Sequence, residues 1–261
     1  GVQTTLVAAW ADDAAGSELE RLLSDSGVSA MRVRRGNAAT IEKLRIVAGP
    51  QQIVRVDRED TSPLDRDGAD EAFAMVASAL GDDLTRTAIV VSDYAKGMLD
   101  AGLVGRVIDF ARERGVPVVV DPKSSDIHKY RGATIVKPNF AEALQMAGLT
   151  ADTVDDATLA LVAERLLVAG IGSLAVSLSA VGVEVIEASA RTRIPTRARL
   201  VADVSGAGDS MIAGIAAGIA SGLSVLQSVQ VGNMAAGIAC GRPGTAVVSR
   251  SDLLDELLVE A

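Results

Sequence analysis

Residues 116–123, VPVVVDPK, decide the fold class of this chain. They join a fully apolar run at 116–120 to a polar turn that contains Asp121 and Lys123. An apolar run without alternation predicts a strand buried on both faces, which is typical of parallel sheets. Ligands of open α/β sheets bind where such strands end, so the polar turn marks a candidate site.

Strands and helices alternate on both sides of this stretch. The spacing of apolar residues predicts strands at 2–9, 87–92, 134–136 and 174–177, and a strand pair at 183–187 and 191–194. Helices are predicted at 16–23, 69–80, 103–114, 141–147, 157–169, 209–221, 225–241 and 251–259. This order predicts an α/β fold with a mostly parallel central sheet covered by helices on both faces.

A further hairpin is predicted from strands at 40–47 and 52–57. The first arm carries Lys43 and Arg45, and the second arm carries Arg55. One face of the hairpin is therefore polar. Such a hairpin is either a solvated flap or a lid over a polar ligand. We expect a single domain over 1–261, incomplete at its N-terminal end, with the hairpin inserted at 38–58.

Composition and charge narrow the classes of function that the chain can have. The chain has 261 residues, a formal net charge of −9 and a pI near 4.7, which disfavours binding to nucleic acid or anionic membranes. One cysteine and one histidine exclude an internal disulfide and a multi-histidine metal centre. The apolar stretch at 211–223 is too short to span a bilayer. These features fit a cytoplasmic protein.

The strongest functional signal is DVSGAGDS at 203–210, which leads directly into an apolar helix. Glycines let backbone N–H groups converge at a helix N-terminus, where the helix dipole favours a phosphate. Asp209 at the same point could accept the proton of an attacking hydroxyl. The alternative is a glycine-rich turn in which Asp209 only caps the helix. The string is neither a Walker A loop nor a dinucleotide-binding fingerprint.

Together with KPNFAE at 137–142, GNMAA at 232–236 and GRPGT at 241–245, this string resembles the PfkB (ribokinase-like) carbohydrate kinases. The resemblance implies a three-layer α/β/α sandwich, ATP as co-substrate and Mg²⁺. It implies an anion hole at Gly206, Ala207 and Gly208 with Asp209 as base. The nucleotide-binding residues that it implies are Asn139, Glu142, Ser177, Gly182, Asn233 and Gly244. Asn139 and Glu142 would hold Mg²⁺ through water, and K⁺ would lie near Asp203, Ala239, Arg242 and Gly244.

Other segments resemble one branch of that family, the kinases of D-glycero-D-manno-heptose 7-phosphate. They are SDYAKG at 92–97, DPK at 121–123, YRGAT at 130–134 and the hairpin. The resemblance implies phosphoryl transfer from ATP to the C1 hydroxyl, giving heptose 1,7-bisphosphate on the route to ADP-heptose. It also implies a homodimer formed through the hairpin. The substrate-binding residues that it implies are Asp93, Lys96, Lys123, Lys43, Arg45 and Arg55.

The chain departs from the family pattern at three places. The opening strand with an Asp and a Gly-Gly loop is not found, Ser179 stands where a nucleotide-loop glycine is usual, and Val204 replaces a usual Thr. Two rivals therefore stay open. One is another family member that acts on fructose phosphate, ribose or a nucleoside. The other is a non-catalytic sugar-phosphate or nucleotide sensor.

Overall fold

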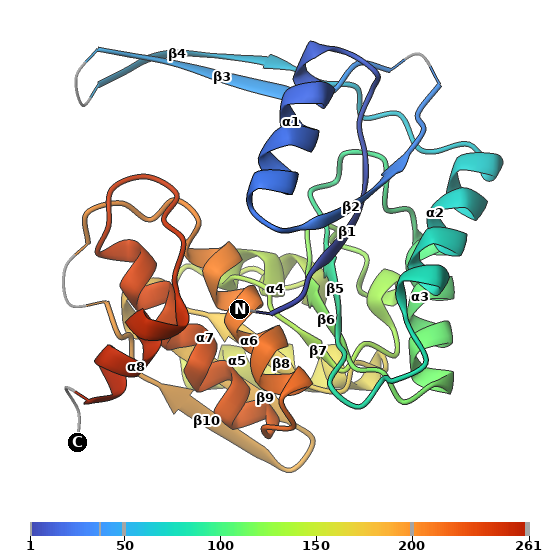
Figure 1. The fold of residues 1–261 in the computed structure, drawn as a ribbon. Helices are drawn as coiled ribbons and strands as arrows, with labels where there is room; N and C mark the ends of the chain where they lie inside the picture. The colour runs from blue at the N-terminus through green and yellow to red at the C-terminus, as the bar shows by residue number, and fades with distance from the viewer. Residues whose placement is uncertain (1, 37, 49–50, 199–200, 259–261) are drawn as a thin grey trace. The chain divides into compact units, whose positions relative to one another are not determined.

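The computed structural model describes residues 2–36, 38–48, 51–198 and 201–258. Its contacts divide the chain into two compact units. The first contains 82–94 and 104–261, and the second contains 2–81 and 95–103. Figure 1 labels the elements of both.

A six-stranded sheet forms the centre of the first unit, in the order β10-β9-β8-β7-β6-β5. Four neighbouring strands are parallel: β5 (Ile89–Ser92), β6 (Val118–Asp121), β7 (Ile135–Val136) and β8 (Leu174–Ser177). The remaining two, β9 (Val183–Glu187) and β10 (Ala190–Ile194), run antiparallel at one edge. The predicted mostly parallel sheet is confirmed, and the strand pair at 183–194 forms its edge.

Helices cover both faces of this sheet. Val118, Val119 and Val120 are all at most 2% exposed although successive side chains on a strand point to opposite faces. On one face, α6 (Ala207–Ala220) and α7 (Val225–Cys240) pack through Met211, Ile215 and Val229. The other helices of this unit are most of α3 (Ala101–Glu113), then α4 (Phe140–Ala147), α5 (Asp156–Val168) and α8 (Arg250–Leu258), with single 3-10 turns at Ile127–Tyr130 and Ser179–Val181.

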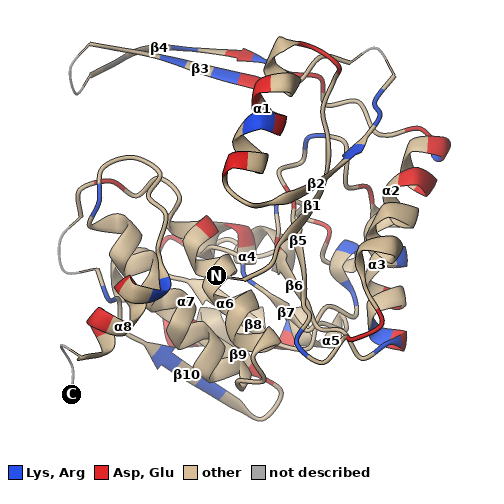
Figure 2. Ribbon diagram, viewed as in Figure 1, with Lys and Arg blue, Asp and Glu red and all other residues tan. Residues whose placement is uncertain are grey.

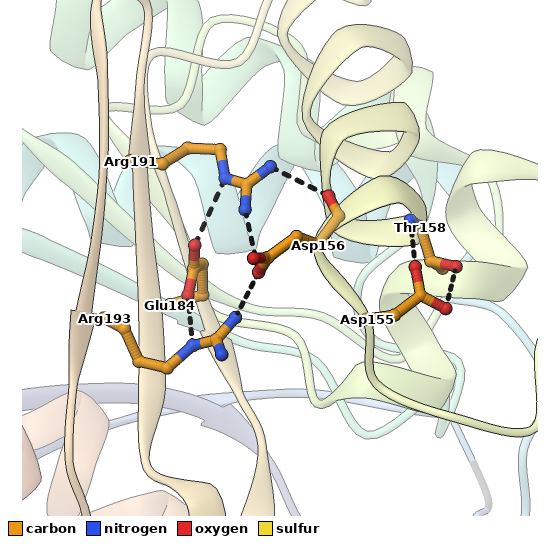
Figure 3. Close-up of polar contacts among 6 residues, drawn as sticks. All are labelled: Asp155, Asp156, Thr158, Glu184, Arg191 and Arg193. Carbon is orange, nitrogen blue, oxygen red and sulfur yellow. Dashed lines mark hydrogen bonds and ion pairs between the residues drawn. The ribbon is translucent and has the colours of Figure 1, made fainter.

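An ionic cluster fixes the antiparallel edge of the sheet to α5 (Figure 3). Glu184 of β9 is 3% exposed, and its two carboxylate oxygens accept from Arg191 (3.2 Å) and Arg193 (2.8 Å) of β10. Both arginines also reach Asp156 at the start of α5. Neighbouring Asp155 caps the same helix by accepting from the backbone N–H of Thr158 at 2.8 Å. The buried charge is thereby compensated, as a buried carboxylate requires.

The second unit contains a separate two-stranded parallel sheet of β1 (Thr5–Ala9) and β2 (Ser29–Val33). It packs with α1 (Ala14–Asp25) and α2 (Arg66–Ala79). Trp10 is buried beside it and donates its indole N–H to Glu20 at 2.9 Å. Strand β2 was not predicted from the sequence.

The predicted hairpin is confirmed as β3 (Glu42–Ala48) and β4 (Gln51–Arg58). The register pairs Lys43 with Asp57 and Arg45 with Arg55 on one face. Figure 2 shows the basic and acidic segments along the two strands. The other face carries exposed apolar side chains, namely Leu44, Ile46, Val54 and Val56. Among the described residues, no helix is both long and apolar enough to cross a membrane.

Candidate active site

The glycine loop before α6 leaves backbone donors open. Gly206 adopts a left-handed conformation (φ 78°), and a Cβ there would lie 2.7 Å from the Thr245 methyl group, so only glycine fits. Within the described part of the chain, no side chain caps this helix, and the N–H groups of Gly208 and Asp209 have no acceptor. The Ala207 N–H instead donates to the Val204 carbonyl at 3.2 Å, so Ala207 does not offer the free donor that the resemblance implied. Free donors at a helix N-terminus form an anion site.

Asp209 lies in the first turn of α6, since the helix begins at Ala207 rather than at residue 209. The N-cap is Gly206, so the alternative in which Asp209 only caps the helix is wrong. The Asp209 side chain is exposed, and its Oδ1 accepts the hydroxyl of Tyr94 at 3.0 Å. Burial, and then the hydrogen bond to Asp209, raise the pKa of Tyr94, so the phenol stays protonated and donates.

The carboxyl ends of β5, β6 and β7 bring further polar side chains to the same edge. Lys137, which follows β7, is 5% exposed and pairs with Asp121 at the end of β6 (Nζ–Oδ1 3.0 Å). Its Nζ lies 3.7 Å from the point where a Cβ on Gly208 would be. Burial raises the pKa of Asp121, and the attraction of Lys137 lowers it in part. A buried ammonium thus lies directly beneath the glycine loop.

Asn139 and Glu142 form a capping box at the start of α4. The Asn139 side chain accepts from the Glu142 N–H at 2.9 Å, and Glu142 Oε2 accepts from the Asn139 N–H at 3.0 Å. Glu142 Oε1 accepts from Lys123 Nζ at 3.0 Å. Each carboxylate oxygen keeps a lone pair for a water of a hydrated cation, so the pair fits an outer-shell contact with Mg²⁺.

Asp93 is the most deeply buried of the predicted substrate ligands, with a side chain 2% exposed. Its Oδ2 accepts from Lys129 Nζ and from the Tyr130 hydroxyl, both at 2.6 Å. The Tyr130 oxygen in turn accepts from the backbone N–H groups of Lys123 and Ser124. This network fixes the turn after β6. A contact between Asp93 and a sugar stays a prediction.

The predicted nucleotide residues are placed as follows. Ser177 ends β8, next to Asn139, with which it forms an isolated parallel bridge. Gly182 has φ 114°, and a Cβ there would lie 2.0 Å from the Ile194 carbonyl oxygen, so its glycine is required by the protein backbone itself. Asn233 is 5% exposed and donates to the Pro195 carbonyl at 2.8 Å. Ser179 has φ 52°, a conformation that favours the glycine it replaces.

Asp203 connects the two loops of the proposed K⁺ site. One carboxylate oxygen accepts from the Ser205 N–H at 2.9 Å and the other from the Gly244 N–H at 3.1 Å. These bonds, led by that of Ser205, lower the pKa of Asp203. The Ala239 carbonyl accepts from the Arg242 N–H at 3.1 Å. The assignment of these four residues to a cation stays a prediction.

The remaining predicted substrate ligands belong to the second unit. Lys43 pairs with Asp57 (3.0 Å) and Glu59 (3.4 Å), Lys96 pairs with the same Glu59 at 2.5 Å, and Arg55 pairs with Asp57 at 2.9 Å. Arg45 has no partner among the described residues and faces Arg55 across the hairpin. Like charges directly opposite one another are unfavourable unless an anion joins them.

The first unit therefore gathers Asp209, the glycine loop, Asn139, Glu142 and Lys123 at the carboxyl edge of its sheet. Tyr94, Asp121 and Lys137 belong to polar clusters that the sequence places at strand ends, where ligands of α/β sheets bind. No individual role was predicted for them, because their contacts with Asp209 and with one another depend on the order of the strands.

The chain is similar in sequence and in fold to known proteins. The sequence profile described as "pfkB family carbohydrate kinase" matches residues 1–252. The "Bifunctional protein HldE" of Rhodospirillum rubrum is 36% identical over 256 residues, which is 97% of this chain and 51% of that protein. The protein of the same name from Magnetococcus marinus is 38% identical over 277 residues, or 100% and 54%. The chain thus spans about half the length of these relatives.

Two solved structures share the fold. Phosphofructokinase-2 from Escherichia coli in complex with potassium superposes with a TM-score of 0.83 at 19% identity, covering 100% of this chain and 84% of that one. Ribokinase from Giardia lamblia superposes with a TM-score of 0.80 at 19% identity, covering 98% of this chain and 83% of that one. The predicted ribokinase-like fold class is confirmed.

Proposed function

Because this chain belongs to the pfkB family of carbohydrate kinases, we propose that it transfers the γ-phosphoryl group of ATP to the C1 hydroxyl of D-glycero-D-manno-heptose 7-phosphate. The observation that carries the kinase function is the uncapped N-terminus of α6, with Asp209 beside it and the Lys137 ammonium beneath it. The choice of acceptor is supported by the segments at 92–97, 121–123 and 130–134 that resemble heptose 7-phosphate kinases.

In this proposal Asp209 accepts the proton of the acceptor hydroxyl as its oxygen attacks the γ-phosphorus. A bond forms between that oxygen and phosphorus, the bond to the β–γ bridging oxygen breaks, and ADP leaves. The N–H groups of Gly208 and Asp209 and the Lys137 ammonium face the equatorial oxygens, on which negative charge develops. Preorganised donors of this kind stabilise the transition state without rearrangement at the moment of reaction.

Two cations complete the proposed site. Asn139 and Glu142 would hold hydrated Mg²⁺, which neutralises phosphate charge when it is bound. Asp203 would hold K⁺ together with carbonyls near Ala239, Arg242 and Gly244. Because Asp203 already joins the loops at 205 and 244, it sets the conformation of the segment that leads into the anion site.

A coupled assay of ADP release tests the function directly. The 261-residue chain would be given ATP with heptose 7-phosphate, fructose 6-phosphate, ribose or adenosine in separate reactions. We expect turnover on the heptose phosphate, and Asp209→Asn should abolish it while the KM for ATP changes by only about a few-fold, since the base acts in the chemical step. Turnover on another acceptor alone would refute the heptose assignment. Silence on all four would contradict the proposed kinase function of this chain.

A further inference from the structure

Tyr94 contacts Asp209 from an unusual position. Its side chain is 60% exposed, yet its hydroxyl donates to Asp209 Oδ1 at 3.0 Å, joining the end of β5 to the first turn of α6. An exposed aromatic side chain gains little from burial at such a place. The hydrogen bond to Asp209 is therefore the feature of Tyr94 that calls for a functional explanation.

The backbone on the N-terminal side of Tyr94 is firmly fixed. Asp93 extends the pairing of β5 with β6 by donating its N–H to the Asp121 carbonyl at 3.0 Å. The buried Asp93 carboxylate is held by Lys129 and by the hydroxyl of fully buried Tyr130. Asp93 thus anchors the backbone of the residue that follows it.

The backbone on the C-terminal side is constrained as well. Ala95 adopts φ 53°, a left-handed conformation that a non-glycine residue rarely adopts. A turn of this kind persists where the surrounding structure determines it, and such turns concentrate at functional sites. The backbone is thus constrained on both sides of Tyr94, which sets the direction of its Cα–Cβ bond.

We propose that Tyr94 is a positioning residue for Asp209, holding Oδ1 so that Oδ2 is left to receive the proton of the acceptor hydroxyl. The assignment rests on the proposed kinase function. A carboxylate has two oxygens, and one fixed donor orients the second. Tyr94 would act only through Asp209 and would not bind the phosphate or the sugar.

The charged groups around this contact are consistent with such a role. Asp121 is close enough for its charge to raise the pKa of Tyr94 further, after burial and Asp209, whereas a hydrogen bond with Ser92 lowers it. Lys137 lies beneath Gly208 and is paired with Asp121. The phenol therefore faces two carboxylates and keeps its proton, which is what a donor to Asp209 needs.

The contact itself can be tested without turnover. The chain has two tyrosines, so the tyrosinate absorbance of Tyr94 is the difference between the pH titrations of the wild type and Tyr94→Phe. In Asp209→Asn burial still raises the pKa of Tyr94 but the charge of Asp209 no longer does, so Tyr94 should titrate at lower pH than in the wild type. Identical Tyr94 titrations in the two proteins would overturn the proposal.

The role is tested by the kinetics of Tyr94→Phe, which removes only the hydroxyl. We expect kcat to fall about threefold to tenfold, as for the loss of one hydrogen bond, with the KM for ATP and for the acceptor unchanged. Tyr94→Ala should lose no more, because the ring has no role. A wild-type kcat in Tyr94→Phe, or a raised acceptor KM with normal kcat, would refute positioning. Failure of the kinase function itself would appear instead as an inactive wild type.

Discussion

Lys137 shows at the scale of one residue how burial changes the meaning of a sequence position. A lysine directly after an apolar strand is usually a solvated charge at the strand end. Here it is buried, and its charge is compensated by Asp121. Because removing one member of a buried pair leaves the other charge uncompensated, Lys137→Met should lower the free energy of unfolding by about 3 kcal/mol at neutral pH.

The pH dependence of this variant follows from Asp121. Burial raises the pKa of that carboxyl, and the loss of Lys137 would raise it further. An acid with a raised pKa in the folded state contributes less stability as pH rises through the interval between its unfolded and folded values. The loss in free energy of unfolding caused by Lys137→Met should therefore be largest at neutral pH and become smaller on acidification.

Urea unfolding of the wild type and of Lys137→Met at neutral and acidic pH checks this prediction. Lys123→Met is a matched control, because Lys123 is exposed and its ion pair with Glu142 should contribute little to stability. If Lys137→Met lowers the free energy of unfolding equally at both pH values, the role of Asp121 is contradicted.

At the residue scale, a site can be proposed from sequence where its chemistry is local. The Gly206–Gly208 loop and Asp209 are adjacent in the chain, so a joint function could be proposed for them from one string. The contacts of Asp209 with Tyr94, and of Asp121 with Lys137, join residues far apart in the chain. They depend on strand order, which apolar periodicity does not specify.

At the scale of elements, the packing of α6 on α7 depends on small residues. A Cβ on Gly214 would lie 2.8 Å from the Gly232 Cα, and one on Gly232 would lie 2.6 Å from the Met211 carbonyl oxygen. Because neither helix backbone can give way cheaply, Gly214→Ala should lower the free energy of unfolding by about 1–3 kcal/mol. Since α6 carries Asp209 at its start, kcat should fall as well.

Gly105 in α3 provides the control for Gly214→Ala. Nothing lies within 4 Å of a Cβ added there, so Gly105→Ala should raise the free energy of unfolding by about 0.5–1 kcal/mol through helix propensity. Thermal and urea unfolding of both variants would measure the contrast. If both substitutions change the free energy of unfolding equally, close contact between the helices is not the reason why glycine is required at position 214.

Elements were predictable from sequence where they are long or strongly apolar. The helices at 103–114 and 225–241 and the strand at 174–177 agree with the structure to within two residues. The strand β2 was missed because it has five residues, partly exposed, and is defined by its pairing with β1 rather than by its own pattern. The start of α6 was placed two residues late because glycine is a poor helix former.

At the scale of the whole molecule, the β3–β4 hairpin presents an apolar face with no covering element among the described residues. Leu44, Ile46, Val54 and Val56 are 59%, 46%, 43% and 52% exposed and lie on one face. Apolar side chains grouped in this way mark an interaction surface. The opposite face of the hairpin carries Lys43, Arg45, Arg55 and Asp57. Burial of the apolar face against a partner would remove apolar surface from water, which is favourable.

We therefore expect two copies of the chain to pair through these apolar faces, and sedimentation should show a homodimer. Ile46→Glu places a charge in the apolar face and should give a monomer with an unchanged unfolding midpoint at low protein concentration, because Ile46 is exposed within one copy. Arg45→Glu, one residue away on the charged face, should leave the dimer intact. A wild type that stays monomeric, or a dimer that tolerates Ile46→Glu, would exclude this interface. Loss of the dimer in Arg45→Glu alone would move the interface to the charged face of the hairpin.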